Sequence, residues 1–297
     1  MEAAGTMVRV GFQNILYLTD FSSPSEAALP FVLALAREFG SKIHAMNVVI
    51  PPGYVYTTPD MTAIAIEAVE ERALAEMKRV EVKLAGFPHD IRVVRSTDVW
   101  DPVSAALEEK DIDLVVVGTH GRMGAERYLL GSVAEEILRQ SPVPVLTIGP
   151  AARLHVQHSG HLNRILFATD FSAESAAAAP RAISLARGPN GHLVLLHVAQ
   201  RSKAAAEGAK CDVSVAEAMH RLYEIPRHLA VEGSEAVIEY GDPAERIAEA
   251  ASQRTADMIV IGVRRPAGVP GAATHLQRPT AHKLLVLAPC PVLTIRT

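Results

Sequence analysis

Cysteines are scarce in this sequence, and long apolar runs are missing. Only Cys211 and Cys290 are present, and they do not form the Cys-x-x-Cys pairs that chelate zinc or exchange disulfides. This cysteine usage indicates a reducing compartment such as the cytosol. No window offers about twenty uncharged apolar residues, and no apolar leader follows the first residues. We therefore expect a cytoplasmic protein that is neither secreted nor inserted in a membrane.

An excess of one charge is also missing. The 29 lysines and arginines are interspersed with 33 aspartates and glutamates, which leaves a formal net charge of −4. Nucleic acids and anionic membrane surfaces are bound by basic patches, so we expect no partner of either kind. In contrast, 49% of the 297 residues are hydrophobic, and a chain of this length can form two domains, each with its own core.

The sequence contains an internal repeat, in which one unit occurs twice. Three segments recur in the same order, and their spacing of about 150 residues has the size of a domain. The matching pairs are Ile15–Ser22 with Ile165–Ser172, Asp113–Gly118 with Asp257–Gly262, and Ser141–Ile148 with Ala288–Ile295. We expect a first domain over residues 1–150, a linker over 151–160 and a second domain over 161–297.

Short β-branched runs alternate with longer helical patterns in each unit. This alternation is typical of β-α units around a buried parallel sheet. It predicts the α/β class, with two tandem doubly wound, Rossmann-like sheets of five parallel strands each, in the order 3-2-1-4-5. In the first unit the strands are expected near residues 13–19, 42–49, 91–95, 113–118 and 143–148.

A helix start is expected at Ser23. The segment Ser23–Glu26 offers a capping hydroxyl, a proline at the first helical position and a glutamate at the third. Pro30 falls inside this predicted helix, where it should remove a hydrogen bond and bend the axis. Because Pro180 repeats Pro30 in the second unit, we expect the bend in both units.

A spaced glycine motif follows the fourth predicted strand of the first unit. Asp113–Gly118 runs into Thr-His-Gly121, and after nine further residues Gly131-Ser132-Val133 opens a helical pattern. A glycine turn and a hydroxyl residue at a helix start can cradle phosphates with backbone N–H groups. The spacing differs from the dinucleotide fingerprint and from the P-loop. The simpler alternative is a glycine-rich loop that only connects a strand to a helix.

This motif resembles the nucleotide-binding motif of the universal stress protein family. The family also has an aspartate after strand one and a valine after strand two, which are Asp20 and Val48 here. The resemblance implies an ATP site in which Val48 binds adenine through its backbone and Thr19 and Asp20 line the adenosine end. It also implies that Gly118 approaches the ribose. For Asp20, a role as the N-cap of the following helix is the alternative.

The resemblance assigns the phosphates of ATP to Gly121, Arg122, Gly131, Ser132 and Val133. A glycine lets the backbone approach a ligand closely, and Ser132 at a helix start offers a hydroxyl and N–H groups. Magnesium would arrive with the phosphates and take most of its ligands from water, because no pair of carboxylates with metal-holding spacing is visible. We therefore expect no metal-ligating side chain.

The motif has little that could cleave ATP. His120 is the titratable base inside it, and a general base also needs a positioned water and an orienting partner. We expect no catalytic residue and at most slow hydrolysis. Three functions stay open. The chain is a regulatory or protective ATP-binding protein, an ATP-consuming enzyme of the wider adenosine-binding α/β group, or an interaction module that binds no nucleotide.

The second unit departs from the motif. Gly262 still ends the fourth predicted strand, but Arg264 and Arg265 follow in place of His-Gly, and Pro279 stands where the motif has its serine. A proline has no N–H to donate, so we expect weak nucleotide binding or none in this unit. Arg264, Arg265 and Arg278 leave open a site for another anion, and a positive surface loop is the plainer alternative.

The closing strands Val143–Ile148 and Val292–Ile295 would leave exposed sheet edges if they stayed unpaired. Single-domain universal stress proteins commonly dimerise through this strand. The resemblance therefore implies that the two units form an intramolecular pseudo-dimer, related by a pseudo-twofold axis, with these strands at the interface. Pairing of two chains into a homodimer is a further expectation.

Overall fold

The computed structural model describes residues 11–51, 59–119, 130–153, 162–186, 190–199, 215–227, 234–264 and 279–296. In the first unit the strands are β1 (Asn14–Leu18), β2 (Lys42–Val49), β3 (His89–Arg95), β4 (Leu114–Gly118) and β5 (Val145–Ile148). Its helices are α1 (Ser23–Glu26), α2 (Leu29–Phe39), α3 (Pro59–Lys83), α4 (Trp100–Glu109) and α5 (Ser132–Gln140). All the strands predicted for this unit are confirmed, with small shifts at their ends.

The second unit repeats the order of the first. Its strands are β6 (Arg164–Ala168), β7 (His192–Ala199), β8 (Glu235–Tyr240), β9 (Met258–Val263) and β10 (Val292–Arg296). Its helices are α6 (Ala173–Leu185), α7 (Val215–Arg227), α8 (Pro243–Gln253) and α9 (Pro279–Leu287). The repeat in the sequence is therefore a repeat in the structure, with α6 in the place of α1 and α2.

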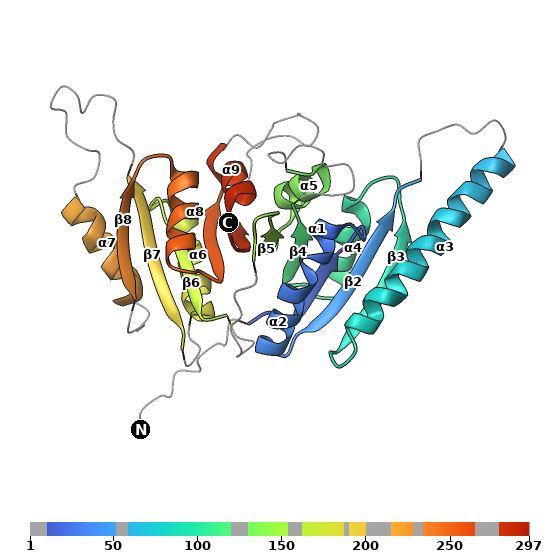
Figure 1. Cartoon of the computed structure of the whole chain (residues 1–297), viewed down its shortest axis with the longest axis horizontal. Coiled ribbons are helices and arrows are strands. Elements are labelled where there is room, and N and C mark those ends of the chain that lie inside the picture. Colours follow the sequence, from blue (N-terminus) through green and yellow to red (C-terminus); the bar gives the residue numbers. More distant parts are fainter. Residues whose placement is uncertain are drawn as a thin grey trace.

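The described strands form one sheet in the order β3-β2-β1-β4-β5-β10-β9-β6-β7-β8 (Figure 1). Neighbouring strands within each half are parallel, and each half has the predicted order 3-2-1-4-5. At the centre β5 and β10 pair antiparallel, with Val292 opposite Thr147. The hydroxyl of Thr147 also donates to the carbonyl of Val292 at 3.1 Å. The predicted meeting of the two closing strands is confirmed.

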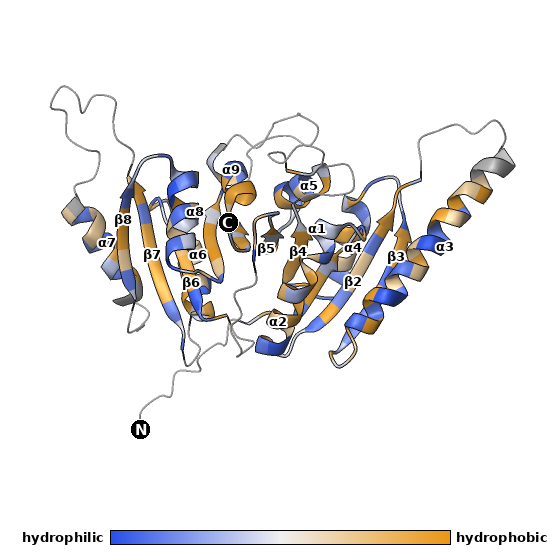
Figure 2. Cartoon of the chain, in the orientation of Figure 1, coloured by the Kyte–Doolittle hydropathy of each residue, from blue (hydrophilic) through white to orange (hydrophobic). Residues whose placement is uncertain are grey.

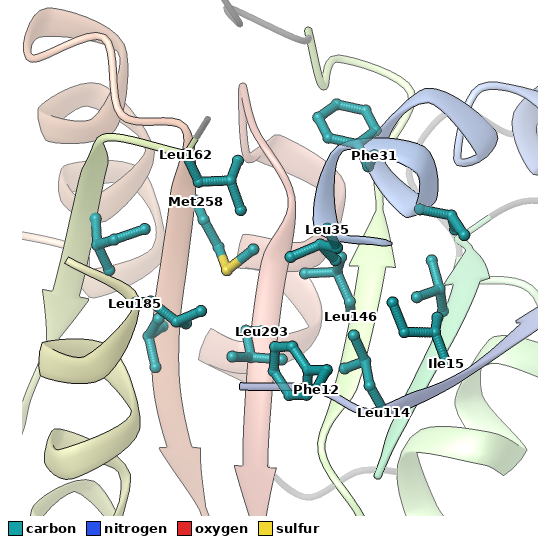
Figure 3. Close-up of a cluster of buried hydrophobic side chains, with 14 of the residues drawn as sticks. Phe12, Ile15, Phe31, Leu35, Leu114, Leu146, Leu162, Leu185, Met258 and Leu293 are labelled. Atoms are coloured by element: carbon teal, nitrogen blue, oxygen red, sulfur yellow. The ribbon is translucent and has the colours of Figure 1, made fainter. Parts of the chain in front are cut away.

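Helices cover both faces of this sheet, and the two units share the buried core. One buried cluster joins the sheet to α2, α3, α6 and α7, and a second joins it to α4, α5, α8 and α9. In the first cluster Met258 and Leu293 of the second unit lie with Leu35 and Leu146 of the first (Figure 3). The apolar colours gather on the strands (Figure 2). The hydrophobic core therefore continues through the β5–β10 junction.

An aspartate before strand four ties strand one into the sheet of each unit. Asp113 accepts hydrogen bonds from the backbone N–H groups of Gln13 at 2.7 Å and Asn14 at 3.1 Å. Asp257 does the same at the start of β6, with both distances 2.8 Å. The aspartate that opens the repeated fourth-strand motif therefore has a structural role in both units.

The helix after β1 differs from its prediction in two ways. Ser22, and not Ser23, is the N-cap, and its hydroxyl accepts from the N–H of Ser25 at 3.4 Å. The predicted single bent helix is two helices separated by a turn at residues 27–28. Pro30 then lies in the first turn of α2, where its missing N–H removes no helical hydrogen bond.

In the second unit α6 runs through Pro180 without a break. Residues 176–179 before this proline are all alanine, and alanine has the highest helix propensity. The helical geometry therefore persists across the missing hydrogen bond. The repeated proline therefore lies in the first turn of a new helix in the first unit and inside a continuous helix in the second.

Candidate functional site

The predicted site residues follow the carboxyl ends of β1, β2 and β4. β1 lies between β2 and β4, and the helices that follow β1 and precede β4 pack on opposite faces of the sheet. The boundary between β1 and β4 is therefore the point where the strand order reverses, and ligands bind there in open parallel sheets. Thr19 and Asp20 follow β1, Val48 is near the end of β2, and Gly118 ends β4.

Thr19 holds the turn that follows β1. Its N–H donates to the carbonyl of Met46 at 3.0 Å, and its hydroxyl accepts from the N–H of Phe21 at 3.0 Å. The same hydroxyl lies 3.1 Å from the hydroxyl of Ser25, and the side-chain amide of Asn47 donates to the carbonyl of Thr19 at 2.7 Å. Thr19 is buried, so it shapes the wall of the site from behind.

The turn is also pinned to the first turn of α1. Phe21 has a φ of 61°, which bulky residues rarely adopt, and its hydrogen bond to Thr19 stabilises that conformation. The hydroxyl of Tyr17 donates to the carbonyl of Ser25 at 2.9 Å. Burial raises the pKa of Tyr17 to about 12, so this hydroxyl stays protonated and remains a donor.

Asp20 orients the N-cap of α1 and is not the cap itself. Its Oδ1 accepts from the N–H of Ser22 at 3.0 Å and from the hydroxyl of Ser22 at 2.5 Å. Ser22 in turn caps the helix, so the N-cap alternative for Asp20 is wrong. Asp20 is half-buried, in contrast to the buried Thr19.

The backbone of Val48 points past the end of β1. Successive residues of a strand direct their peptide groups to alternate sides, and the carbonyl of Met46 accepts from Thr19 on the β1 side. Val48, two residues later, faces the same side, but the pairing of β1 with β2 ends at Leu18 opposite Met46. The N–H and C=O of Val48 therefore border the space beyond β1 and present a donor and an acceptor there.

Gly118 packs against the first turn of α1. A Cβ at this position would lie 2.9 Å from the carbonyl oxygen of Pro24 and 3.2 Å from Cα of Ser25. These are backbone atoms, so a larger residue would push α1 away from the sheet. In the second unit a Cβ on Gly262 would lie even closer to the carbonyl oxygen of Glu174. Helix packing therefore requires the glycine at the end of strand four in both units.

α5 begins at this edge with backbone donors exposed. Its N-cap is Gly131, whose N–H donates to the carbonyl of Thr119 at 2.7 Å and fixes the helix start to the end of β4. The next N–H groups, of Ser132 and Val133, lie in the first turn, where the helix supplies no acceptor. Both residues are exposed. The helix start therefore presents donors and the positive end of its dipole to solvent.

The lack of a capping side chain distinguishes α5 from three other helices. Ser22 caps α1, Ser172 caps α6 and Asp242 caps α8, each by accepting a hydrogen bond from a backbone N–H of the first turn. Gly131 cannot do this. An anion from outside the chain can therefore take the place that a capping oxygen occupies in these other helices.

Part of the predicted motif lies outside the described residues, namely His120, Gly121 and Arg122. Among the residues that the structure does describe, no three His, Cys, Asp or Glu side chains come together as a metal site. No helix in the described part of the chain is long and apolar enough to cross a membrane.

The second unit copies the turn after strand one but changes its surroundings. The hydroxyl of Thr169 accepts from the N–H of Phe171 at 3.0 Å, and Phe171 has a φ of 60°. His197 replaces the asparagine of the first unit, with Nδ1 at 2.9 Å from the carbonyl oxygen of Thr169. α9 begins at Pro279. Pro279, the first described residue of α9, has no N–H to donate.

An ion pair lies in the second unit where strand four ends. Arg264, just after β9, donates from Nε to Oε1 of Glu174, which stands where the first unit has Pro24. The side chain of Glu174 is only 10% exposed, and the hydrogen bond from Arg264 lowers the pKa of its carboxyl. Arg264 is therefore already paired with a carboxylate of the same unit. Arg265 and Arg278 lie outside the described residues.

The sequence reasoning missed three residues that shape the first site, namely Ser25, Asn47 and Thr119. The repeat of Ser25 as Ser175 is a signal that could have singled it out, because both hydroxyls meet the threonine after strand one. Asn47 becomes His197 in the second unit, so the repeat hides its role. Thr119 lies inside the motif, but the sequence does not show that its carbonyl accepts the hydrogen bond from Gly131 at the start of α5.

Comparisons with known proteins agree on one family. A model of the universal stress protein family matches the chain twice, over residues 11–149 and 161–296. A universal stress protein of Methanocaldococcus jannaschii is 30% identical over 141 residues, which cover 46% of this chain and 82% of that protein. The solved structure of a universal stress protein from Archaeoglobus fulgidus shares the fold, with a TM-score of 0.69, 21% identity and coverage of 95% of this chain and 98% of that one.

Proposed function

Because the chain belongs to the universal stress protein family, with one family unit in each half, we propose that its first unit binds one ATP together with magnesium. We propose that residues 1–150 form this nucleotide-binding unit and residues 161–297 a partner unit with a degenerate site. The protein then acts in the cytoplasm as a regulatory or protective binding protein of the stress response, with at most slow hydrolysis of ATP.

The start of α5 is the observation that carries this proposal. Ser132 and Val133 are exposed residues in the first turn of α5, their N–H groups lie at the positive end of the helix dipole, and the N-cap residue Gly131 has no side chain to cap them. The N–H of Gly131 already donates to Thr119. Gly131 therefore contributes through its missing side chain, which lets a phosphate approach, and the next two residues supply the donors.

The residues at the carboxyl ends of β1 and β2 suit the adenosine end of ATP. Val48 offers a backbone donor and acceptor beyond the end of β1, which matches the donor and acceptor of the adenine edge. Asp20 is half-buried and anchored through Ser22, and we place it beside the ribose. The Cβ direction of Gly118 points to α1, so this glycine would border the ribose with its peptide group. Thr19 supports the wall from behind.

Magnesium needs oxygen ligands. Since the described residues contain no group of three acidic or histidine side chains suited to a metal, the phosphates and water would supply most of these ligands. The protein would hold the ion through ATP. This arrangement supplies charge neutralisation for the phosphates and gives no reason to expect rapid cleavage.

Two features of the second unit support a single site per chain. Pro279 removes an N–H at the helix start that corresponds to Ser132, and the pair of Glu174 with Arg264 fills the end of strand four with the protein's own charges. We propose that this unit binds no ATP and serves as a structural and regulatory partner.

The nature of the bound molecule tests the proposed function directly. The full chain is purified, and nucleotide released by acid is identified and counted against protein. ATP at one per chain, with most added ATP intact after incubation, is the expected result. Rapid turnover would instead indicate an ATP-consuming enzyme, and a chain that neither carries nor takes up ATP would be an interaction module. Either result would overturn the proposal.

A further inference from the structure

α5 connects the candidate site of the first unit to the second unit. It begins at Ser132 in the site and ends at Gln140, and a helix of its nine residues is about 13 Å long. At its far end the guanidinium of Arg296, from β10 of the second unit, donates through Nη1 to the carbonyl of Arg139. Carbonyls in the last turn of a helix lack intrahelical donors, and a cation there also favours the helix dipole. The second unit thus caps a helix of the first.

The contact that the first unit makes with α9 differs from the contact of Arg296 with α5, although β5 and β10 are equivalent strands of the repeat. The repeat aligns Gly149, after β5, with Arg296 of β10. Gly149 approaches the end of α9 so closely that a Cβ would lie 2.7 Å from the carbonyl oxygen of Leu285. Gly149 has no side chain to donate with. At these two equivalent positions, α5 therefore contacts an arginine of the other unit, and α9 contacts a glycine.

α5 can transmit a change from one end to the other. Its inner side is packed by Ala134, Ile137 and Leu138, which are all buried. Its start is tied to β4 through the hydrogen bond from Gly131 to Thr119. Without an anchor at its last turn, the helix can fray or tilt, and its first-turn N–H groups move with it. Direct attraction between Arg296 and a bound phosphate is weak, because the helix length exceeds the screening length of about 8 Å in physiological salt.

We propose that Arg296 is a positioning residue for the nucleotide site of the first unit, which it serves from the second unit by holding the C-terminal end of α5. This proposal rests on the proposed function, because it assigns to that same site a contribution from the partner unit. It gives the degenerate unit a defined role in ligand binding, since removal of one of its side chains weakens a site that it does not touch.

The test uses the full chain and two readouts. Arg296→Ala is compared with Arg296→Lys, which keeps a cationic donor, and with Arg254→Ala as a matched control. Arg254 lies in the second unit near the end of α8 and pairs with Glu235 at 3.0 Å. ATP affinity is measured by calorimetry, and amide hydrogen exchange is followed at residues 135–138 of α5 without nucleotide.

We expect Arg296→Ala to weaken ATP binding about tenfold, within the usual range of coupling between sites, and to speed amide exchange in α5. Arg296→Lys should retain most of the ATP affinity and most of the protection from amide exchange. Arg254→Ala should keep both at the wild-type level. Unchanged exchange in α5, or unchanged affinity in a chain that binds ATP, would overturn the proposal. If the wild-type chain binds no ATP, the proposed function fails, and the exchange readout alone decides whether Arg296 holds the helix.

Discussion

The two units keep the same turn after strand one and differ at the helix after strand four. The hydroxyls of Thr19 and Thr169 accept the same backbone hydrogen bond, and Ser22 and Ser172 cap the following helices. In contrast, α5 starts with an uncapped glycine, and α9 starts with a proline. Features that fold the unit are thus retained in both halves, and features that would bind phosphate are retained in one.

This difference separates two kinds of glycine in the motif. Gly262 remains in the unit whose helix start has lost an N–H, because a Cβ there would collide with the first turn of α6. Its counterpart Gly118 packs on α1 in the same way. A glycine at the end of strand four is therefore required for helix packing and does not by itself indicate a nucleotide site. The start of the following helix is the better indicator of a nucleotide site.

The largest expected effect comes from a negative charge at the start of α5. Val133→Asp places a carboxylate in the first turn, where it favours the helix dipole but repels a phosphate at short range. We expect ATP affinity to fall by about a hundredfold or more, since like charges at close contact cost several kcal/mol. The stability of the protein should not fall. Calorimetry and urea unfolding measure the two quantities.

The matched control is Thr280→Asp. Thr280 holds the equivalent position in α9 and is exposed, so the added carboxylate has the same helix context without a phosphate site beside it. ATP binding should remain at the wild-type level. Equal losses in the two variants would show that the added charge acts over long range, and the assigned site would then be wrong.

The strand-four glycines should matter for stability in both units. Gly118→Ala and Gly262→Ala each add a Cβ against the backbone of a helix, and overpacking of this kind costs about 1–3 kcal/mol. The loss should be greater for Gly262→Ala, because its closest approach is shorter. Urea unfolding of the full chain tests this. Wild-type stability in both variants would show that the helices move aside freely.

Proline in place of Ser132 should weaken ATP binding in the first unit, whereas serine in place of Pro279 should not create ATP binding in the second. Ser132→Pro removes one N–H at a position where proline is compatible with a helix, so ATP affinity should fall about tenfold with little change in stability. Pro279→Ser restores an N–H in α9 but leaves Arg264 paired with Glu174. Calorimetry should therefore detect no second site. A second site in Pro279→Ser would mean that the proline alone inactivates this unit.

The smallest effect concerns a histidine that only the first unit contains. His44 of β2 is buried, with Nδ1 at 3.1 Å from Asp90 and Nε2 at 3.3 Å from Asn14, and the second unit has Val194 at this place. Burial lowers the pKa of His44, although Asp90 opposes the shift. The folded protein thus binds this proton less readily than the unfolded chain. Stability from this group is present above about pH 6.5 and is lost as the pH falls through the folded pKa.

His44→Val should remove this pH dependence. Between about pH 7 and pH 5 the wild-type free energy of unfolding should fall more than that of the variant, by less than about 1 kcal/mol because Asp90 offsets much of the effect of burial. Urea unfolding at both pH values gives the comparison. Parallel losses in the two proteins would show that His44 does not titrate in this range.

The sequence predicted the architecture because the repeat and the β-branched runs are local signals. The strand order and the pairing of β5 with β10 both agree with the structure. The pairing of Glu174 with Arg264 could not be predicted, because these residues meet only through the fold. Pro30 lies at the start of a helix and Pro180 lies inside one, and this difference depends on the neighbouring residues and not on the proline itself.

Calorimetric titration of the full chain with ATP and magnesium tests the central claim most directly. The account predicts one site per chain, which Val133→Asp removes and Thr280→Asp leaves intact. Two equal sites per chain, or a single site that survives Val133→Asp, would contradict the assignment of nucleotide binding to the first unit.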